Sequence, residues 1–217
     1  MVRLSAIIIS LFLIFSFQAQ AKNPPPGTGT SDIPANILIM LDNSGSMSAK
    51  LYNSVQVYYP LDVATDSSGN VYVMEYYNNR IKVFDSSGAY LRSFGGYGSG
   101  CTRWKYARQF DIYDDKIYLA DTYSHQIKVM NLNGGCVEYN TSIFNYPHAI
   151  AASQYKVYVG FASRTEIRSF YRNRIYMSDS WSSGGVIQYP WGMSISKDET
   201  KLVIADYSAN RLIRLGI

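Results

Sequence analysis

Few side chains in this 217-residue chain could carry out catalysis or bind a transition metal. The sequence holds two histidines, His125 and His148, and two cysteines, Cys101 and Cys136. A catalytic zinc site needs several histidines or a combined Cys and His set. The sequence also contains no Gly-x-Ser-x-Gly elbow, phosphate loop or paired Cys/His nucleophile. The residue types therefore predict no catalytic residues.

The two cysteines are interpreted together with the start of the chain. Residues 1–21 combine Arg3, the apolar run 4–17 and a small-x-small site ending at Ala21, which is typical of a secretory signal peptide. This mostly apolar run of fourteen residues is shorter than the ~20 residues that a membrane-spanning helix needs. We therefore predict a secreted or cell-surface protein without a membrane span in its mature part. In an oxidising compartment Cys101 and Cys136 are expected to form a disulfide, the alternative being two unrelated thiols.

Composition favours β-structure and argues against nucleic acid as a partner. The chain has 20 tyrosines, a residue that suits half-buried pleated surfaces. Its net charge is +4 and its basic residues are scattered, whereas nucleic-acid binding needs a basic stripe.

The elements that would position these residues repeat along the chain. Similar segments begin at positions 60, 107, 147 and 190, at spacings of 47, 40 and 43 residues. Each holds short alternating runs, such as 71–73 and 81–83, separated by turn sequences such as 67–70 and 85–88. Several short strands within a period of forty-odd residues predict four-stranded β-sheets rather than a helical solenoid.

The repeated pattern resembles the NHL repeat. Its elements are Pro-x-x-Val/Ile-Ala, then apolar-Tyr-Val-x-Asp, then Asn-x-Arg-Ile-x-Val, and they cover residues 52–217. The third copy departs from the pattern at Phe161 and Glu166, and residues 173–189 echo half a repeat. The resemblance implies an all-β fold, a β-propeller with four readable blades in a ring of up to six.

The resemblance also assigns the polar residues of the repeat. The acidic positions Glu75, Asp121 and Asp206, with Arg80 and Arg211 after them, are expected to fix turns and contacts between blades. His148 lies just before an inner-strand segment, so it could face the central channel, although a lone histidine there is usually a structural residue.

Closure of the ring has two alternatives. Residues 54–59 alternate and could supply the missing outermost strand of the last blade, joining the two ends of the chain. Alternatively, the sequence is the front part of a longer product.

A second resemblance lies ahead of the repeats. Residues 37–51 contain an apolar run followed by Asp42, Ser44 and Ser46, which resembles the first strand and metal loop of von Willebrand factor type A domains. This resemblance implies that the three residues bind Mg²⁺ or Ca²⁺, weakly if the later ligands of such a domain are absent. Residues 22–36 form a Pro/Gly-rich spacer. The order of segments resembles bacterial pilus-tip adhesins.

These observations predict a recognition or adhesion module that binds a protein or glycan through propeller loops, assisted by a divalent cation. The expected binding residues are Arg103, Trp104 and Lys105 in one loop, near Tyr97, and Trp181 in another, because Tyr, Trp and Arg dominate binding hot spots. The alternative for Trp104 and Trp181 is packing between blades. The alternative function is a propeller hydrolase or lyase, of the lactonase or amidating-lyase type, with a metal in the central channel.

Overall fold

A computed structural model describes residues 50–51, 55–140, 145–162, 166–182 and 187–217. The chain divides into two units, Met1–Leu38 and Ile39–Ile217, and every described residue belongs to the second. The predicted signal peptide, the spacer and the predicted metal ligands Asp42, Ser44 and Ser46 lie outside the described residues.

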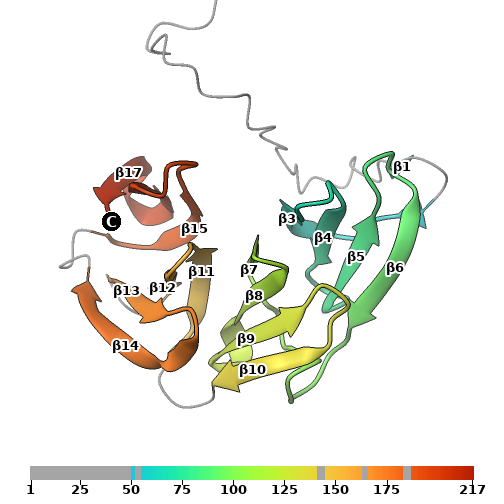
Figure 1. Ribbon diagram of the computed structural model, residues 1–217, viewed down its shortest axis with the longest axis horizontal. Coiled ribbons are helices and arrows are strands. Elements are labelled where there is room, and N and C mark those ends of the chain that lie inside the picture. Colours follow the sequence, from blue (N-terminus) through green and yellow to red (C-terminus); the bar gives the residue numbers. More distant parts are fainter. Residues whose placement is uncertain (1–49, 52–54, 141–144, 163–165, 183–186) are drawn as a thin grey trace, which may run out of the picture. The chain divides into compact units, whose positions relative to one another are not determined.

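The described residues form four successive antiparallel sheets, which we call blades 1 to 4 (Figure 1). Blade 1 comprises β3 (Pro60–Thr65), β4 (Val71–Glu75), β5 (Arg80–Phe84) and β6 (Tyr90–Gly95). Blade 2 comprises β7 (Gln109–Tyr113), β8 (Lys116–Asp121), β9 (Gln126–Asn131) and β10 (Cys136–Asn140). Blade 3 comprises β11 (Pro147–Ala152), β12 (Lys156–Phe161), β13 (Ile167–Tyr171) and β14 (Arg174–Ser182). Blade 4 comprises β15 (Pro190–Ile195), β16 (Lys201–Asp206) and β17 (Arg211–Gly216).

This arrangement confirms the predicted all-β fold. The only helices among the described residues are two three-residue 3-10 turns, η1 (Thr122–Ser124) and η2 (Tyr207–Ala209). No helix in the described part of the chain is long and apolar enough to cross a membrane. The segment that echoes half a repeat contains β14, so it supplies the outermost strand of blade 3.

Adjacent blades bury apolar side chains from both of their facing sheets. Tyr72 and Ile81 of blade 1 pack with Leu119 of blade 2, and all three are fully buried. The middle strands are covered on both faces, which explains why β4 and β8 are nearly continuous apolar runs. Burial of apolar surface stabilises a fold by about 25 cal/mol per Å². It is therefore the main contribution that holds one blade against the next.

Side chains on the inner strands also join the blades through hydrogen bonds. The Asp62 carboxylate on β3 accepts a bond of 2.8 Å from the Phe110 N–H on β7. Gln109 on β7 accepts bonds from the N–H groups of Ile150 and Met193, at 2.9 and 3.1 Å, on β11 and β15. An inner strand has one edge without a partner strand, and these side chains satisfy N–H groups that would otherwise be unpaired there.

Contrary to one alternative for closing the ring, the described segment before blade 1 does not pair with blade 4. β2 (Val55–Gln56) pairs with β1 (Lys50–Leu51), and Val57 packs against Val73 and Phe84 of blade 1. Residues 55–57 therefore cover blade 1 and do not complete blade 4, because their apolar side chains find a partner in the nearest blade.

Blade 4 exposes a position that the other blades bury. Leu212 on β17 is 77% exposed, whereas Ile81 and Ile127 at the corresponding positions of blades 1 and 2 are 0% exposed.

The predicted disulfide is confirmed. Cys101 and Cys136 are bonded, with their Cα atoms 5.4 Å apart. The bond joins the loop before β7 to the start of β10, the outer strand of the same blade.

Candidate functional site

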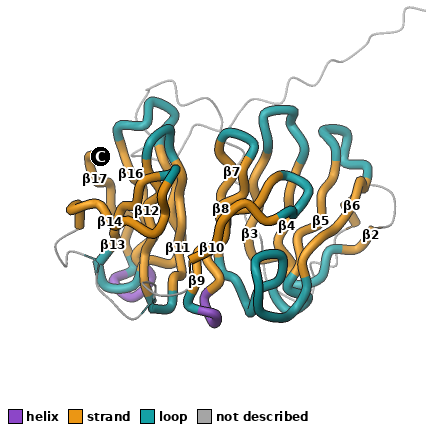
Figure 2. Tube along the Cα trace, turned by 60° about the horizontal axis from the view of Figure 1, so that its bottom comes forward, coloured by secondary structure: helices purple, strands orange, loops and turns teal. Residues whose placement is uncertain are grey.

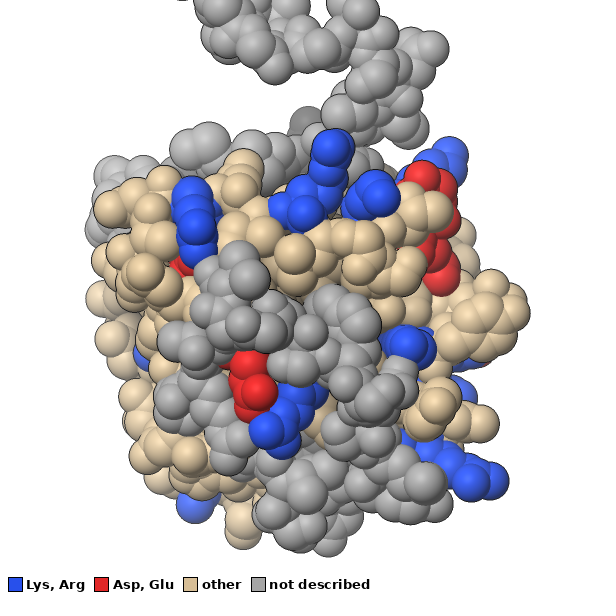
Figure 3. Space-filling model, turned by 90° about the vertical axis from the view of Figure 1, so that its left-hand side faces the viewer, with Lys and Arg blue, Asp and Glu red and all other residues tan. Residues whose placement is uncertain are grey.

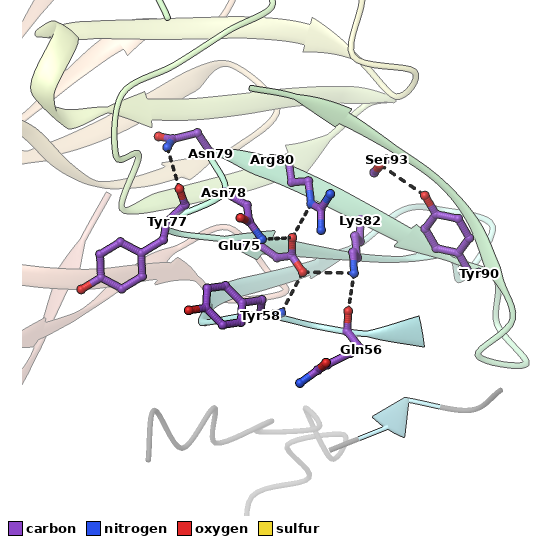
Figure 4. Close-up of polar contacts among 10 residues, drawn as sticks. All are labelled: Gln56, Tyr58, Glu75, Tyr77, Asn78, Asn79, Arg80, Lys82, Tyr90 and Ser93. Atoms are coloured by element: carbon purple, nitrogen blue, oxygen red, sulfur yellow. Dashed lines mark hydrogen bonds and ion pairs between the residues drawn. The ribbon is translucent and has the colours of Figure 1, made fainter. Parts of the chain in front are cut away.

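A buried acid at the end of the second strand organises each of three blades. In blade 1, Glu75 accepts a hydrogen bond of 2.7 Å from the Tyr58 N–H and one of 3.0 Å from Asn78 (Figure 4). Its carboxylate also contacts Arg80 and, at 3.2 Å, Lys82. Burial would raise the pKa of Glu75, but these donors, Arg80 foremost, outweigh burial and lower it. Glu75 is therefore a structural carboxylate that stays ionised.

The acids of blades 2 and 4 repeat this arrangement. Asp121 accepts a bond of 2.8 Å from the Lys105 N–H, and Asp206 accepts one of 2.7 Å from the Tyr189 N–H. Each acid thus holds a backbone N–H in the segment that leads into its own inner strand. These hydrogen bonds agree with the structural role that the sequence predicted for the three acids.

A second set of contacts ties the entry loops of blades 2 and 3 to the preceding blade. Asn79 and His125 both have a positive φ, of 51° and 58°, in the turn between second and third strands. The Asn79 Oδ1 accepts a bond of 2.6 Å from the Tyr106 N–H, and the His125 Nδ1 accepts one of 3.1 Å from the Tyr146 N–H. Blade 3 has Phe161 in place of an acid. Its entry loop is held instead by His125, which belongs to blade 2.

These anchored loops present a surface that we call the tyrosine face. A tyrosine precedes the opening residue of every blade, and others lie in the turns after the second strands; the two 3-10 turns lie at the same end of the strands (Figure 2). The rings touch edge to face, for example Tyr59 with Tyr77 at 4.8 Å and Tyr106 with Tyr123 at 5.6 Å between centroids. The exposed members are Tyr58, Tyr59, Tyr77, Tyr97, Tyr123, Tyr146, Trp191 and Tyr207.

A central cavity of about 120 Å³ opens among the inner strands of all four blades. Leu61, Arg108, His148 and Trp191 line it, and each is the residue that follows the opening Pro or Ala of its blade. In blades 1, 3 and 4 the strand pairing shifts by one residue at this position. Such bulges re-aim a side chain, and here they bring Leu61, His148 and Trp191 to the cavity that Arg108 also lines.

Two of these side chains are polar and carry nitrogen atoms that are buried without a hydrogen-bond partner. His148 is 2% exposed, and neither of its ring nitrogens is hydrogen-bonded. Burial lowers the pKa of His148 to about 4, and the Arg108 guanidinium acts in the same direction. The carbonyls of Trp191 and Pro190 oppose this lowering without adopting hydrogen-bond geometry. His148 is therefore neutral at pH 7 and faces the channel, where its position before an inner strand suggested it could lie.

Arg108 is stacked rather than ion-paired. Its guanidinium carbon lies 4.8 Å from the Tyr76 ring centroid and 5.5 Å from that of Trp191. Its Nε is buried and has no hydrogen-bond partner. The sequence analysis did not single out Arg108, and the available signal was its place directly after the opening residue of a blade.

Two inner-strand carboxyls are affected by burial. Burial raises the pKa of Asp62 to about 8, against the opposing effect of the Phe110 N–H, and raises that of Asp111 to about 6. Part of the Asp62 residue borders the cavity, but its carboxyl group is enclosed by protein, which is the environment that sets its pKa. Asp62 is therefore mostly neutral at pH 7. Asp111 accepts a bond of 2.8 Å from the Ala152 N–H.

The predicted binding loop is largely an anchored part of the core. Trp104 is 1% exposed, so the expectation that it is an exposed contact is wrong. It packs over Gly95 (φ 108°), where any Cβ would overlap its ring. Arg103 is exposed, whereas Lys105 is half-buried beside the Tyr97 ring. The side chain of Trp181 lies outside the described residues.

Lys and Arg are scattered over the side of the molecule drawn in Figure 3. The described residues also contain no group of three or more His, Cys, Asp or Glu side chains placed to hold a metal ion.

Comparisons with known proteins agree on the fold. Residues 57–84 match the NHL repeat family. No curated protein sequence matches the chain. The architecture is a β-propeller of NHL-like blades.

Three solved structures share this architecture at low sequence identity. A structure titled as a nidogen/laminin complex gives a TM-score of 0.62 at 14% identity, over 74% of this chain and 60% of that one. A streptogramin B lyase gives 0.56 at 12%, over 78% and 58%. The computationally designed Ika4 protein gives 0.54 at 17%, over 79% and 99%. This chain thus spans about three fifths of the length of the two natural proteins, and the likeness establishes the fold alone.

Proposed function

We propose that this protein is a secreted or cell-surface recognition module of the adhesion type, and that the tyrosine face binds a protein or glycan partner. The observation that carries the proposal is that three blades use a buried acid to hold tyrosine-bearing loops at one end of the strands. Tyrosine offers a large contact area with few rotatable bonds and a hydroxyl that can bond the partner. Anchored loops lose little entropy on binding, which favours recognition.

Propellers of this kind include proteins that bind other proteins and proteins that are enzymes, and the two natural neighbours illustrate both. The chemistry around the cavity favours binding. His148 lacks a neighbouring carboxylate or nucleophile to which it is bonded, so nothing orients it as a general base. The predicted signal peptide supports a location outside the cell, where adhesion takes place.

The test compares two sets of exposed tyrosines. Changing Tyr77, Tyr123 and Tyr207 together to Ser should reduce binding to intact cells and to a glycan array at least tenfold, with little change in melting temperature. The matched control changes the exposed tyrosines Tyr90, Tyr155 and Tyr171, which lie outside the tyrosine face. Equal binding by both triple variants would refute the proposed surface.

A second assay addresses the alternative function. The purified protein should not hydrolyse lactones or cleave lyase substrates when Mg²⁺, Ca²⁺ or Zn²⁺ is added. Metal-dependent turnover that disappears in His148→Ala would establish the propeller hydrolase or lyase instead.

The predicted metal loop forms a separate part of the proposal. We expect Asp42, Ser44 and Ser46 to bind Mg²⁺ or Ca²⁺ weakly in the 217-residue chain, because three oxygen ligands on one loop do not complete a hard-cation site. Titration calorimetry should show a dissociation constant of roughly millimolar or weaker, the range of weak oxygen-ligand sites. Tight binding that survives Asp42→Ala would show that other residues hold the ion.

A further inference from the structure

Arg108 differs from the other arginines that line the tyrosine face. Arg80 and Arg211 each pair with the buried acid of their own blade. The Arg108 side chain has no ion pair or hydrogen bond among the described residues, and its Nε–H is buried. A buried donor left without a partner has lost its bonds to water without replacing them, which is unfavourable. Stacking between Tyr76 and Trp191 fixes the guanidinium plane but leaves its donors available.

His148, on the neighbouring blade, also has buried nitrogen atoms without hydrogen-bond partners. Its two unpartnered nitrogens provide one donor and one acceptor when the ring is neutral. Arg108 and His148 both line the cavity of about 120 Å³. The buried His148 ring and the buried Nε–H of Arg108 are both unsatisfied at one cavity, which indicates a missing ligand, because buried polar groups in native proteins are nearly always hydrogen-bonded.

The lining defines the chemistry of that ligand. The guanidinium is the only ionised group that lines the cavity at pH 7, because His148 and most of Asp62 are neutral there. A planar guanidinium matches a carboxylate in geometry and charge.

The size of the cavity limits what can enter. Sites that enclose a whole small molecule measure about 300–1,000 Å³. A cavity of about 120 Å³ takes an end group, and the rest of the ligand would lie on the tyrosine face around its mouth.

We propose that the central cavity binds the terminal carboxylate of a polypeptide partner, with Arg108 pairing with the carboxylate and His148 donating a hydrogen bond to it. This inference rests on the proposed recognition function and names the chemistry of its partner. A polypeptide is favoured over an acidic sugar because its carboxylate sits on a single narrow carbon, whereas a uronic acid carries its carboxylate on a full ring.

The test uses acetyl-trialanine as a free acid and as the C-terminal amide, titrated by calorimetry or by NMR. The free acid should bind saturably, and the amide at least tenfold more weakly. Arg108→Gln should reduce binding of the free acid at least tenfold, and Arg108→Lys should restore part of it. The matched control is Arg214→Gln, an exposed arginine on β17 that lies outside the cavity lining and should leave binding unchanged.

Each other outcome would overturn the assignment. Equal binding of acid and amide would exclude a carboxylate subsite. If acetate binds as tightly as the peptide, the ligand is a small free acid. If glucuronate binds more tightly than the peptide, the ligand is an acidic sugar. If acid and amide bind equally while the tyrosine variants still lose cell binding, the recognition proposal stands and this inference alone fails.

Discussion

Replacing Lys128 by Met should destabilise the protein strongly, because it leaves a buried carboxylate without its counter-ion. The Lys128 ammonium lies 2.7 Å from Asp121, and both side chains are 0% exposed. The ammonium also donates to the carbonyls of Gly100, at 2.6 Å, and Arg103. Removing one partner of a buried pair costs about 3–5 kcal/mol. In a chain of this size that corresponds to a fall in melting temperature of roughly 6–20 °C.

Urea denaturation and thermal melting of Lys128→Met would measure this cost. The matched control is Arg211→Met, because Arg211 also pairs with a buried acid but has a side chain that is 44% exposed. Its loss should cost no more than about 1 kcal/mol. The double variant Asp121→Asn with Lys128→Met should be more stable than Lys128→Met alone. A cost below about 1 kcal/mol for Lys128→Met, or no recovery in the double variant, would refute the reasoning.

Three further predictions concern the disulfide, the blade interfaces and pH. Changing Cys101 and Cys136 to Ser should lower the free energy of unfolding by about 3–4 kcal/mol, since the bond closes a loop with a sequence separation of 35; free thiols in the denatured, unreduced protein would contradict the bond. Ile127→Ala should cost about 2–5 kcal/mol in urea titrations and Leu212→Ala under about 1, because only the former is buried, and equal costs would show that Leu212 is covered. The pKa of Asp62 is about 8 in the folded state and near 3.8 when unfolded, so the folded state retains this proton as pH rises through that interval and stability falls. Asp62→Asn should flatten that part of the stability profile, and an unchanged slope would show that Asp62 does not carry it.

Sequence periodicity predicted the strands because each blade is a local unit. The alternating runs at 71–73 and 81–83 became β4 and β5 at those positions. The disulfide was also predictable, because pairing two cysteines leaves no other choice of partner. Contacts between blades depend on residues that are distant in sequence, and there the analysis was weaker.

Trp104 shows why exposure was harder to predict. Its neighbours Arg103 and Lys105 are charged, which suggested an exposed loop. The burial comes from Gly95, whose missing side chain leaves space for the indole ring. The proposed pairing of residues 54–59 with blade 4 was wrong for a similar reason. The apolar side chains of Val55 and Val57 suit either end of the array, and only packing decides between the two.

The cavity was not predicted because its residues share a position and not a type. No common chemistry links Leu61, Arg108, His148 and Trp191, and the bulges at three of these four positions have no sequence signature of their own. The signal that could have found them is alignment of the repeats at their opening Pro or Ala. The same alignment shows a tyrosine one residue earlier in every blade, at 59, 106, 146 and 189.

The buried acids couple stability to recognition. A carboxylate such as Asp206 bonds both a strand arginine and the N–H groups of its entry loop, so the interaction that secures the blade also fixes the tyrosines beside it. Blade 3 lacks this carboxylate; the Tyr146 N–H donates to His125 instead, and the Tyr146 carbonyl accepts a bond from the Ala162 N–H. Because a bond to an ionised acceptor is roughly twice as strong as one between neutral groups, Tyr146 should be the least constrained of the tyrosines that precede the blades. Partners of differing shape would then be accommodated mainly by movement of Tyr146, while the tyrosines of the other three blades keep their positions.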